Sequence, residues 1–357
     1  MNNNPRNAPW LAILALAAWM VYVVACAMYQ PAISPDGTKI LYLSPADEQK
    51  NNRADLMIYD RIAGTTRQLM ECEIKEGMLA AQWTPDGKEV VVVSAQGVKV
   101  MSLDGRTPMR RFELPGGLDK ETTYLYAPPI VGKYQYFGGE FLYRLDFNTG
   151  AVVSSTNQSK PPLLIGNNGH VFYWSPEEGA FGTLDLETLA PKLLLKVSAG
   201  TDNDKLPFVA LSPDESLLAI SVEDGKKIRL YRNNKMFREI TLETAVHPYK
   251  TSFMLWAPRR QVLYAVYSYP FKVENESRTQ LGLLEVDLER DLIREIPIVL
   301  TEDSDEKGLA LRPVISPDGK LMYVASFVVE KNGRGLYTID LTSPNRDLKK
   351  VSMKLIK

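Results

Sequence analysis

The sequence predicts an all-β fold, a seven-bladed β-propeller of four-stranded antiparallel blades over residues 30–357, preceded by one N-terminal hydrophobic helix within residues 1–29. Two recurring features favour the propeller. A Ser-Pro-Asp-Gly turn, or a variant of it, repeatedly joins two apolar strands, and a later strand in most repeats ends in aspartate. Self-similarity with a period of about 40 to 50 residues is typical of propellers and solenoids.

The first expected element is residues 10–29, an uncharged apolar stretch of 20 residues. A helix of this length, at about 1.5 Å per residue, matches the hydrocarbon core of a bilayer. Trp10 and Tyr29 flank the stretch as interfacial aromatic residues do, and Arg6 before it favours a cytoplasmic N-terminus. We therefore expect a membrane anchor that leaves the propeller facing the periplasm or another extracytoplasmic side.

Three fates are open for this segment. It can remain as an uncleaved helix, or Val-Val-Ala before Cys26 can act as a bacterial lipobox, which makes Cys26 the candidate lipidation site. Alternatively, Ala25-Cys26-Ala27 can be a signal-peptidase pattern that releases a soluble product. The first two fates keep the protein on a membrane, and the sequence does not choose between the inner and the outer one.

Five repeats carry the turn or a recognisable variant, and they begin at Pro31, Ala80, Pro207, Ser252 and Arg312. In the full motif proline presets φ, aspartate bonds to the local backbone and glycine accepts a positive φ. A short apolar strand precedes each turn and an alternating β-branched or aromatic strand follows it. Each repeat therefore contains a β-hairpin.

The third strand of most repeats ends in an aspartate that we expect to cap the following turn. These residues are Asp60, Asp104, Asp146, Asp185, Asp287 and Asp340, while one repeat has IRLY ending at Tyr231 instead. A further apolar stretch follows each of them, which makes four strands per unit. Two degenerate repeats, from Ala127 and Pro161, bring the number to seven. Blades one and seven must then meet to close the ring, and a strand exchange there is left open.

The SPDG-centred repeats resemble the TolB-type and WD-repeat-like propeller family over about residues 31–357. The resemblance implies the propeller fold and does not select one function. Propellers of that family serve as periplasmic scaffolds, as lids on serine peptidases and as ligand-binding modules.

Composition argues against several classes of function. The chain has 42 Lys plus Arg against 43 Asp plus Glu, so we expect no nucleic-acid partner. Two cysteines and two histidines are too few for a disulfide framework or a multi-histidine metal site. Turn chemistry accounts for Asp36, Asp86, Asp214 and Asp318, and no G-x-S-x-G elbow occurs. We expect no catalytic, metal-binding or cofactor-binding residues, and no enzyme activity.

Three connections between second and third strands are long and polar, at residues 45–55, 269–280 and 328–335. They belong to blades one, six and seven, which are neighbours in a closed ring, so we expect them on one sector of one face. Loops on a rigid scaffold often bind partners. The candidate partner-binding residues are Asn52, Arg53, Asn275, Arg278, Asn332 and Arg334.

The sequence therefore favours a membrane-tethered propeller that acts as a protein–protein interaction scaffold in the bacterial cell envelope, with an envelope or membrane protein as its partner. The alternative is a small-ligand-binding or enzymatic propeller with its site at the mouth of the central channel. The expected inner strands are mostly apolar, with Gln82 and Arg312 as isolated polar members, which favours the scaffold.

Overall fold

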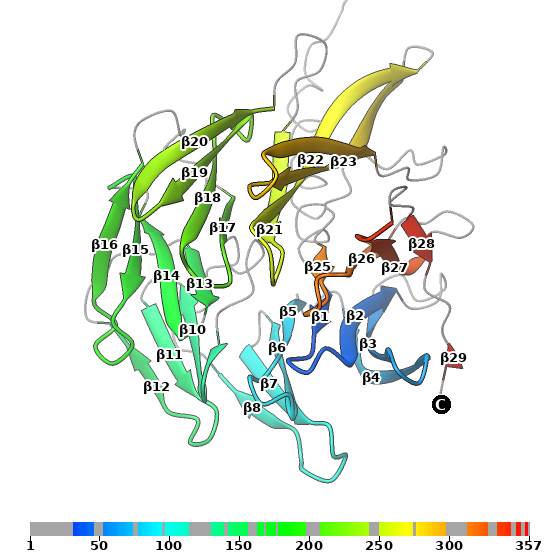
Figure 1. Cartoon of the computed structure of the whole chain (residues 1–357). Helices are drawn as coiled ribbons and strands as arrows, with labels where there is room; N and C mark the ends of the chain where they lie inside the picture. Colours follow the sequence, from blue (N-terminus) through cyan, green and yellow to red (C-terminus); the bar gives the residue numbers. More distant parts are fainter. Residues whose placement is uncertain are drawn as a thin grey trace, which may run out of the picture.

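Seven antiparallel sheets form a closed ring, in agreement with the repeats. In the computed structural model each sheet contains four strands that are paired in chain order, and one sheet gains a fifth strand. The first strands lie near the centre of the ring and the fourth strands at its rim (Figure 1). The structure describes residues 31–45, 53–73, 78–94, 97–113, 130–138, 142–155, 163–167, 169–175, 178–197, 208–242, 250–273, 276–297, 313–327, 334–343, 348–350 and 354–355.

The strands of the first four blades have the following bounds. Blade 1 has β1 (Ala32–Ile33), β2 (Lys39–Pro45), β3 (Arg53–Asp60) and β4 (Thr65–Glu73). Blade 2 has β5 (Met78–Trp83), β6 (Glu89–Ser94), β7 (Gly97–Ser102) and β8 (Arg110–Phe112). Blade 3 has β9 (Ile130–Val131), β10 (Tyr134–Gly138), β11 (Leu142–Asp146) and β12 (Val152–Ser154). Blade 4 has β13 (Leu163–Asn167), β14 (His170–Ser175), β15 (Ala180–Leu184) and β16 (Pro191–Lys196).

The remaining three blades follow the same order. Blade 5 has β17 (Val209–Leu211), β18 (Leu217–Val222), β19 (Lys227–Arg232) and β20 (Lys235–Thr241). Blade 6 has β21 (Lys250–Trp256), β22 (Val262–Val273), β23 (Glu276–Asp287) and β24 (Leu292–Pro297). Blade 7 has β25 (Val314–Ile315), β26 (Leu321–Phe327), β27 (Arg334–Asp340) and β28 (Leu348–Lys350), and β29 (Lys354–Leu355) comes last.

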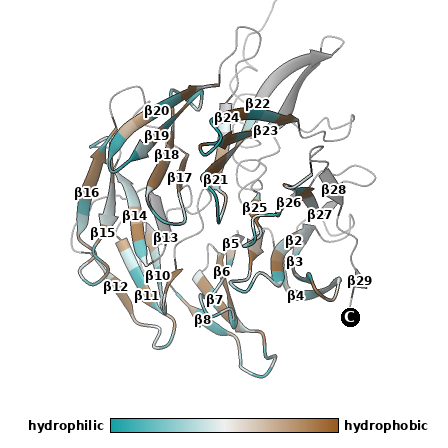
Figure 2. Ribbon diagram, in the orientation of Figure 1, coloured by the Kyte–Doolittle hydropathy of each residue, from teal (hydrophilic) through white to brown (hydrophobic). Residues whose placement is uncertain are grey.

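The hydrophobic core lies between the blades. A second strand such as β18 is buried along its whole length, because the sheets on either side cover both of its faces. This burial explains why its sequence, LLAISV, is nearly all apolar instead of alternating. Fourth strands such as β20 lie at the rim and are largely exposed. Figure 2 shows the most hydrophobic residues along strands that face neighbouring blades and hydrophilic residues at many of the turns.

Blades 1 and 7 close the ring in two ways. Tyr42 and Tyr59 of blade 1 share a hydrophobic cluster with Tyr323 and Leu336 of blade 7. In addition, β29 pairs in parallel with β4 at Thr65 and Thr66, so the chain passes from blade 7 to the outer edge of blade 1 (Figure 1). The closure that the sequence left open therefore adds a fifth strand to blade 1.

The expected N-terminal helix within residues 1–29, with Cys26, lies outside the described part of the chain, which begins at residue 31. Within the residues that are described, no helix is both long and apolar enough to cross a membrane. The anchor and its three fates stay predictions.

Candidate functional site

The Ser-Pro-Asp-Gly turns form one recurring hydrogen-bonded unit. In blade 1 the Ser34 hydroxyl donates to Asp36 Oδ1 at 2.5 Å and accepts from the Lys39 amide at 2.9 Å, while the Thr38 amide donates to Asp36 at 3.0 Å. The bond from Ser34, followed by those from Thr38, favours the ionised carboxylate and lowers the pKa of Asp36 to about 2. The same unit recurs at Thr84 and Asp86, Ser212 and Asp214, and Ser316 and Asp318.

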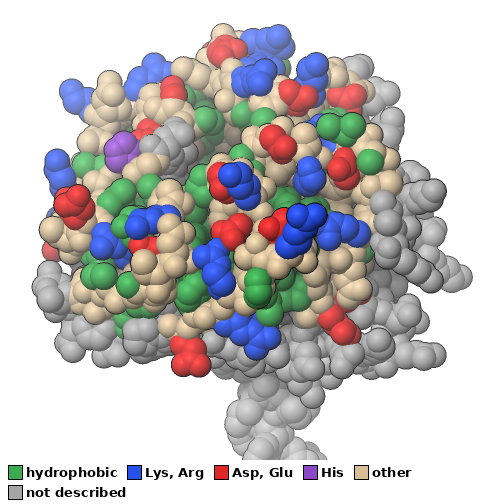
Figure 3. Space-filling view, turned by 90° about the horizontal axis from the view of Figure 1, so that it is seen from below, with side chains coloured by type: hydrophobic (Ala, Val, Ile, Leu, Met, Phe, Trp, Pro, Cys, Tyr) green, Lys and Arg blue, Asp and Glu red, His purple; other side chains and the backbone are tan. Residues whose placement is uncertain are grey.

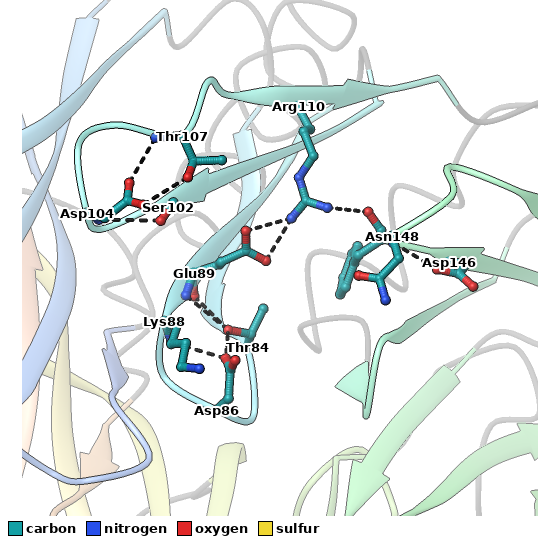
Figure 4. Close-up of polar contacts among 11 residues, drawn as sticks. Thr84, Asp86, Lys88, Glu89, Ser102, Asp104, Thr107, Arg110, Asp146 and Asn148 are labelled. Atoms are coloured by element: carbon teal, nitrogen blue, oxygen red, sulfur yellow. Dashed lines mark hydrogen bonds and ion pairs between the residues drawn. The ribbon is translucent and has the colours of Figure 1, made fainter.

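The strand-terminal aspartates cap the turns that follow them, as predicted. Asp104 Oδ1 accepts the Arg106 amide at 2.8 Å. It also accepts the Thr107 amide at 3.0 Å (Figure 4). These bonds, with the Thr107 amide as the largest cause, lower the pKa of Asp104 to about 2. Equivalent bonds occur at Asp60, Asp146, Asp185, Asp287 and Asp340.

Both kinds of turn lie on the same face of the ring, because Lys39 after the first turn pairs with Asp60 before the second. We call this face the turn face, and the opposite one, with the connections between second and third strands, the loop face. The carboxylates of these turns already accept local hydrogen bonds. Their recurrence is therefore explained by backbone geometry.

Arginines connect neighbouring blades on the turn face. In blade 2, Arg110 Nη2 donates to both carboxylate oxygens of Glu89, at 2.6 and 2.7 Å, and Nη1 donates to the carbonyl of Phe147 in blade 3 (Figure 4). In blade 3, Arg144 Nη1 donates to the carbonyl of Leu186 in blade 4 at 2.6 Å. Both carbonyls belong to the residue after a strand-terminal aspartate, so the capped turn of one blade presents an acceptor to the blade before it.

The predicted partner-binding residues belong to the loop face. Arg53 begins β3 opposite Glu73, Arg278 lies in β23 opposite Phe271, and Arg334 begins β27. These are third strands of blades 1, 6 and 7. Blades 6 and 7 share one hydrophobic cluster, and blades 7 and 1 share another, so the three backbone positions occupy one sector of the ring. The other predicted residues, Asn52, Asn275 and Asn332, lie outside the described residues.

The expected loop at residues 269–280 is wrong, because most of it is strand. β22 and β23 are 12 residues long, against 9 for β4, the next longest described strand. They pair as far as Val273 and Glu276, which leaves two residues between them. Tyr269, Phe271 and Val273 alternate with other residues at the period of a strand, a signal that the polar composition concealed. We call residues 269–273 and 276–280 the blade 6 arm, which projects beyond the rest of the ring in Figure 1.

A cavity of about 260 Å³ lies between blades 4 and 5 on the turn face, and sequence reasoning missed it. Phe172, Phe181 and Tyr231 are among its walls, and Glu215 lies at its polar side. Nδ1 of His170 lies 2.7 Å from Glu215 Oε2. The signal that could have located it is the turn of blade 5, which reads SPDE and not SPDG.

Three further observations on the described residues concern metal-binding groups, surface charge and the polar residues of the inner strands. No group of three or more His, Cys, Asp and Glu among them could hold a metal ion. Acidic and basic side chains are interspersed with apolar ones on the face shown in Figure 3, without a broad patch of one sign. Of the polar residues expected in the inner strands, Gln82 lies in β5 opposite Val91, and Arg312 is outside the described residues.

No family model matches the chain. Several solved structures are similar to it, including a Kluyveromyces lactis Hsv2 with loop 6CD replaced by a Gly-Ser linker (13% identity, TM-score 0.57, 90% of this chain and 95% of that one). A streptogramin B lyase (14%, 0.54, 83% and 89%) and U3-55K (9%, 0.53, 88% and 96%) are others. At these identities the likeness shows the fold alone.

Proposed function

We propose that this chain is a protein–protein interaction scaffold of the TolB-like, SPDG-repeat type. Residues 10–29 tether it to a membrane of a bacterial cell envelope, with the propeller on the periplasmic or extracytoplasmic side. Its partner is an envelope or membrane protein that docks on the loop face of blades 6, 7 and 1. The observation that carries the proposal is the blade 6 arm.

The arm has the hydrogen-bonding geometry of an incomplete sheet. The pairing of β21 with β22 ends at Ser268, and that of β24 with β23 ends at Gly282. Among the described strands, residues 269–273 and 276–280 therefore pair only with each other. A two-stranded ribbon is marginal in water by itself, and its outer edges present backbone donors and acceptors. A partner strand that pairs with either edge would complete the sheet, which is a common mode of peptide recognition.

The role of the recurring aspartates in the turns agrees with a protein that is not a catalyst. Asp36, Asp86, Asp214 and Asp318 accept bonds from their own turns. The six strand-terminal aspartates do the same. The solved structures of similar fold include one named as a lyase, so the fold itself does not decide the matter. The tether is supported by the length and lack of charge of residues 10–29.

The test is affinity purification of the full chain from native membranes in mild detergent. We expect the wild type to retain a stoichiometric envelope protein, and the variant R53A/R278A/R334A to lose it. A control variant, R106A/K235A/K320A, removes three exposed basic residues at turns of the other face and should retain the partner. Intact-mass analysis of the N-terminus distinguishes the uncleaved helix, the lipidated Cys26 and the cleaved product.

A second variant tests the arm itself. Replacing residues 269–280 with Asn-Gly joins Ser268 to Leu281, which already face each other in the ladder. We expect this variant to fold and to lose the partner. Retention of the partner by the shortened variant, or the absence of any protein partner from the wild type, would overturn the scaffold proposal.

A further inference from the structure

The turn of blade 5 departs from the repeat at its most constrained position. Gly37, Gly87 and Gly319 occupy this position in blades 1, 2 and 7 with φ between 70° and 73°. Blade 5 has Glu215 there, with φ of 60°. A residue with a long side chain rarely adopts this left-handed conformation, and such strain is concentrated at functional sites. Glu215 therefore calls for an explanation outside turn chemistry.

A second departure lies beside the first. The turn between β19 and β20 has two residues, Asn233 and Asn234, because Arg232 pairs with Lys235. Blade 1 has four residues at the same place, between Asp60 and Thr65. Both asparagines have positive φ, 49° and 61°, which suits a tight type I′ hairpin. Glu215 and both asparagines line the cavity between blades 4 and 5, so the two irregular turns of blade 5 meet at one site.

Apolar and aromatic side chains form one part of the cavity wall. Phe172 and Phe181 stack with ring centroids 5.7 Å apart and an interplanar angle of 11°. Tyr231, Leu211 and Leu218 also contribute to the walls. The volume, about 260 Å³, is slightly below the range of drug-sized pockets, about 300–1,000 Å³. It suits a small molecule with one ring or a short branched chain.

One carboxylate oxygen of Glu215, at the polar side of the cavity, has no hydrogen-bond donor among the described residues. Glu215 Oε2 is bound to His170, whereas Oε1 is buried and receives no hydrogen bond from the described residues. Glu215 is also the only charged residue among those that line the described cavity. A buried carboxylate oxygen without a donor is costly, so a ligand with an N–H or O–H group at this point would be favoured.

We propose that this cavity binds a small amphipathic amine, with its ammonium group on Glu215 Oε1 and its apolar body among Phe172, Phe181 and Tyr231. The cation is preferred over a neutral donor for two reasons. The ammonium forms a charge-assisted bond with the carboxylate, and the electron-rich faces of aromatic rings attract a cation. This site is separate from the loop face, and the inference does not depend on the scaffold role.

Calorimetric titration of the purified full-length protein with three probes that share a 2-phenylethyl group tests the proposal. 2-Phenylethylamine has the expected cation, 2-phenylethanol keeps a neutral donor, and 3-phenylpropanoate carries the opposite charge. We expect the amine to bind at least about tenfold more tightly than the alcohol, and the acid not to bind. Equal binding of all three, or no saturable binding of the amine at millimolar concentration, would overturn the proposal.

Two variants and a control connect the binding to this cavity. Glu215→Gln keeps the shape of the side chain. It should weaken the binding of 2-phenylethylamine about tenfold and leave the binding of 2-phenylethanol unchanged. Leu211→Phe fills the cavity and should abolish the binding of both. Glu178→Gln, an exposed acid of blade 4 outside the cavity lining, should change neither. Amine binding that survives in Glu215→Gln at full strength would place the site elsewhere, even if Leu211→Phe failed to fold.

Discussion

Two interfaces between neighbouring blades, 2 with 3 and 4 with 5, are built from the same repeat. They differ in how they are packed and bridged on the turn face. In the first, Val91 and Phe137 are fully buried in one cluster, and Arg110 bridges the blades on the turn face. In the second, a cavity remains beside Phe181, and the contact across it is made by His170 and Glu215. His170 is 63% exposed, whereas the Glu215 side chain is only 19% exposed.

The difference shows how the repeat works. Between blades 2 and 3, a core cluster and an arginine that reaches the next capped turn together close the interface. Between blades 4 and 5, where Glu215 replaces glycine and the other turn is shorter, a core cluster is also present, but a cavity lies beside it on the turn face. Natural sequences break local rules mostly at sites that serve another purpose. The irregular turns therefore indicate more about function than the regular ones do.

The largest expected difference between the two interfaces concerns their cores. Phe137→Ala should lower the free energy of unfolding by about 3–5 kcal/mol, since the side chain is fully buried among close neighbours. Phe181 is also buried, but it lines the cavity, so Phe181→Ala should cost at least about 1 kcal/mol less. Urea unfolding followed by tryptophan fluorescence measures both. Equal losses would mean that the cavity is closed in solution.

Two arginines from fourth strands test the bridges. Arg110→Ala should cost about 1–2 kcal/mol, because the Phe147 carbonyl and Glu89 lose a charged donor. Arg238→Ala should cost less than about 1 kcal/mol, since its partner Asp291 is 82% exposed. The same unfolding titration compares them. A larger loss at Arg238 would show that the blade 2–3 bridge does not stabilise its interface.

Replacing the glycine of a regular turn by a residue with a side chain should destabilise the protein. Gly319 has φ of 72°, and a Cβ added there would meet no other atom within 4 Å, so strain alone opposes a substitution. We expect Gly319→Ala to cost about 1 kcal/mol, and Lys320→Ala, its exposed neighbour, to cost less than about 0.5 kcal/mol. Thermal unfolding of both variants checks this. If both variants unfold with the wild type, the positive φ carries no strain and the argument from Glu215 fails.

The smallest expected effect is a change in how stability depends on pH in the acidic range. The pKa of Asp36 is lowered from 3.8 to about 2, chiefly by Ser34, and the pKa of Asp214 is lowered too, chiefly by Ser212. A lowered pKa in the folded state gives stability above about pH 4 that is lost as the pH falls toward 2. Asp36→Asn and Asp214→Asn should each flatten this part of the pH–stability curve. A change in only one of them would mean that the irregular turn has lost the bonding pattern of the regular one.

The sequence predicts most of the architecture because its repeated turns have a local cause. Pro, Asp and Gly fix the turn geometry within four residues, so five of the seven units could be recognised by this turn or a variant of it, and the other two by their strand-turn-strand pattern. The pairing of β29 with β4 could not be predicted, since it joins Lys354 to Thr65, at opposite ends of the propeller sequence. The cavity depends on packing between two blades in the same way. Its local signs in the sequence are Glu215, in place of the glycine of the repeat, and the short turn at Asn233 and Asn234.

The central claim is that the irregular turn of blade 5 trades stability for a binding site, and Glu215→Gly tests it most directly. This change restores SPDG, so the free energy of unfolding should rise by about 0.5–1 kcal/mol while 2-phenylethylamine binding is lost. Both quantities come from one protein preparation, by urea titration and calorimetry. A variant that is less stable than the wild type, or that still binds the amine equally well, would contradict the claim.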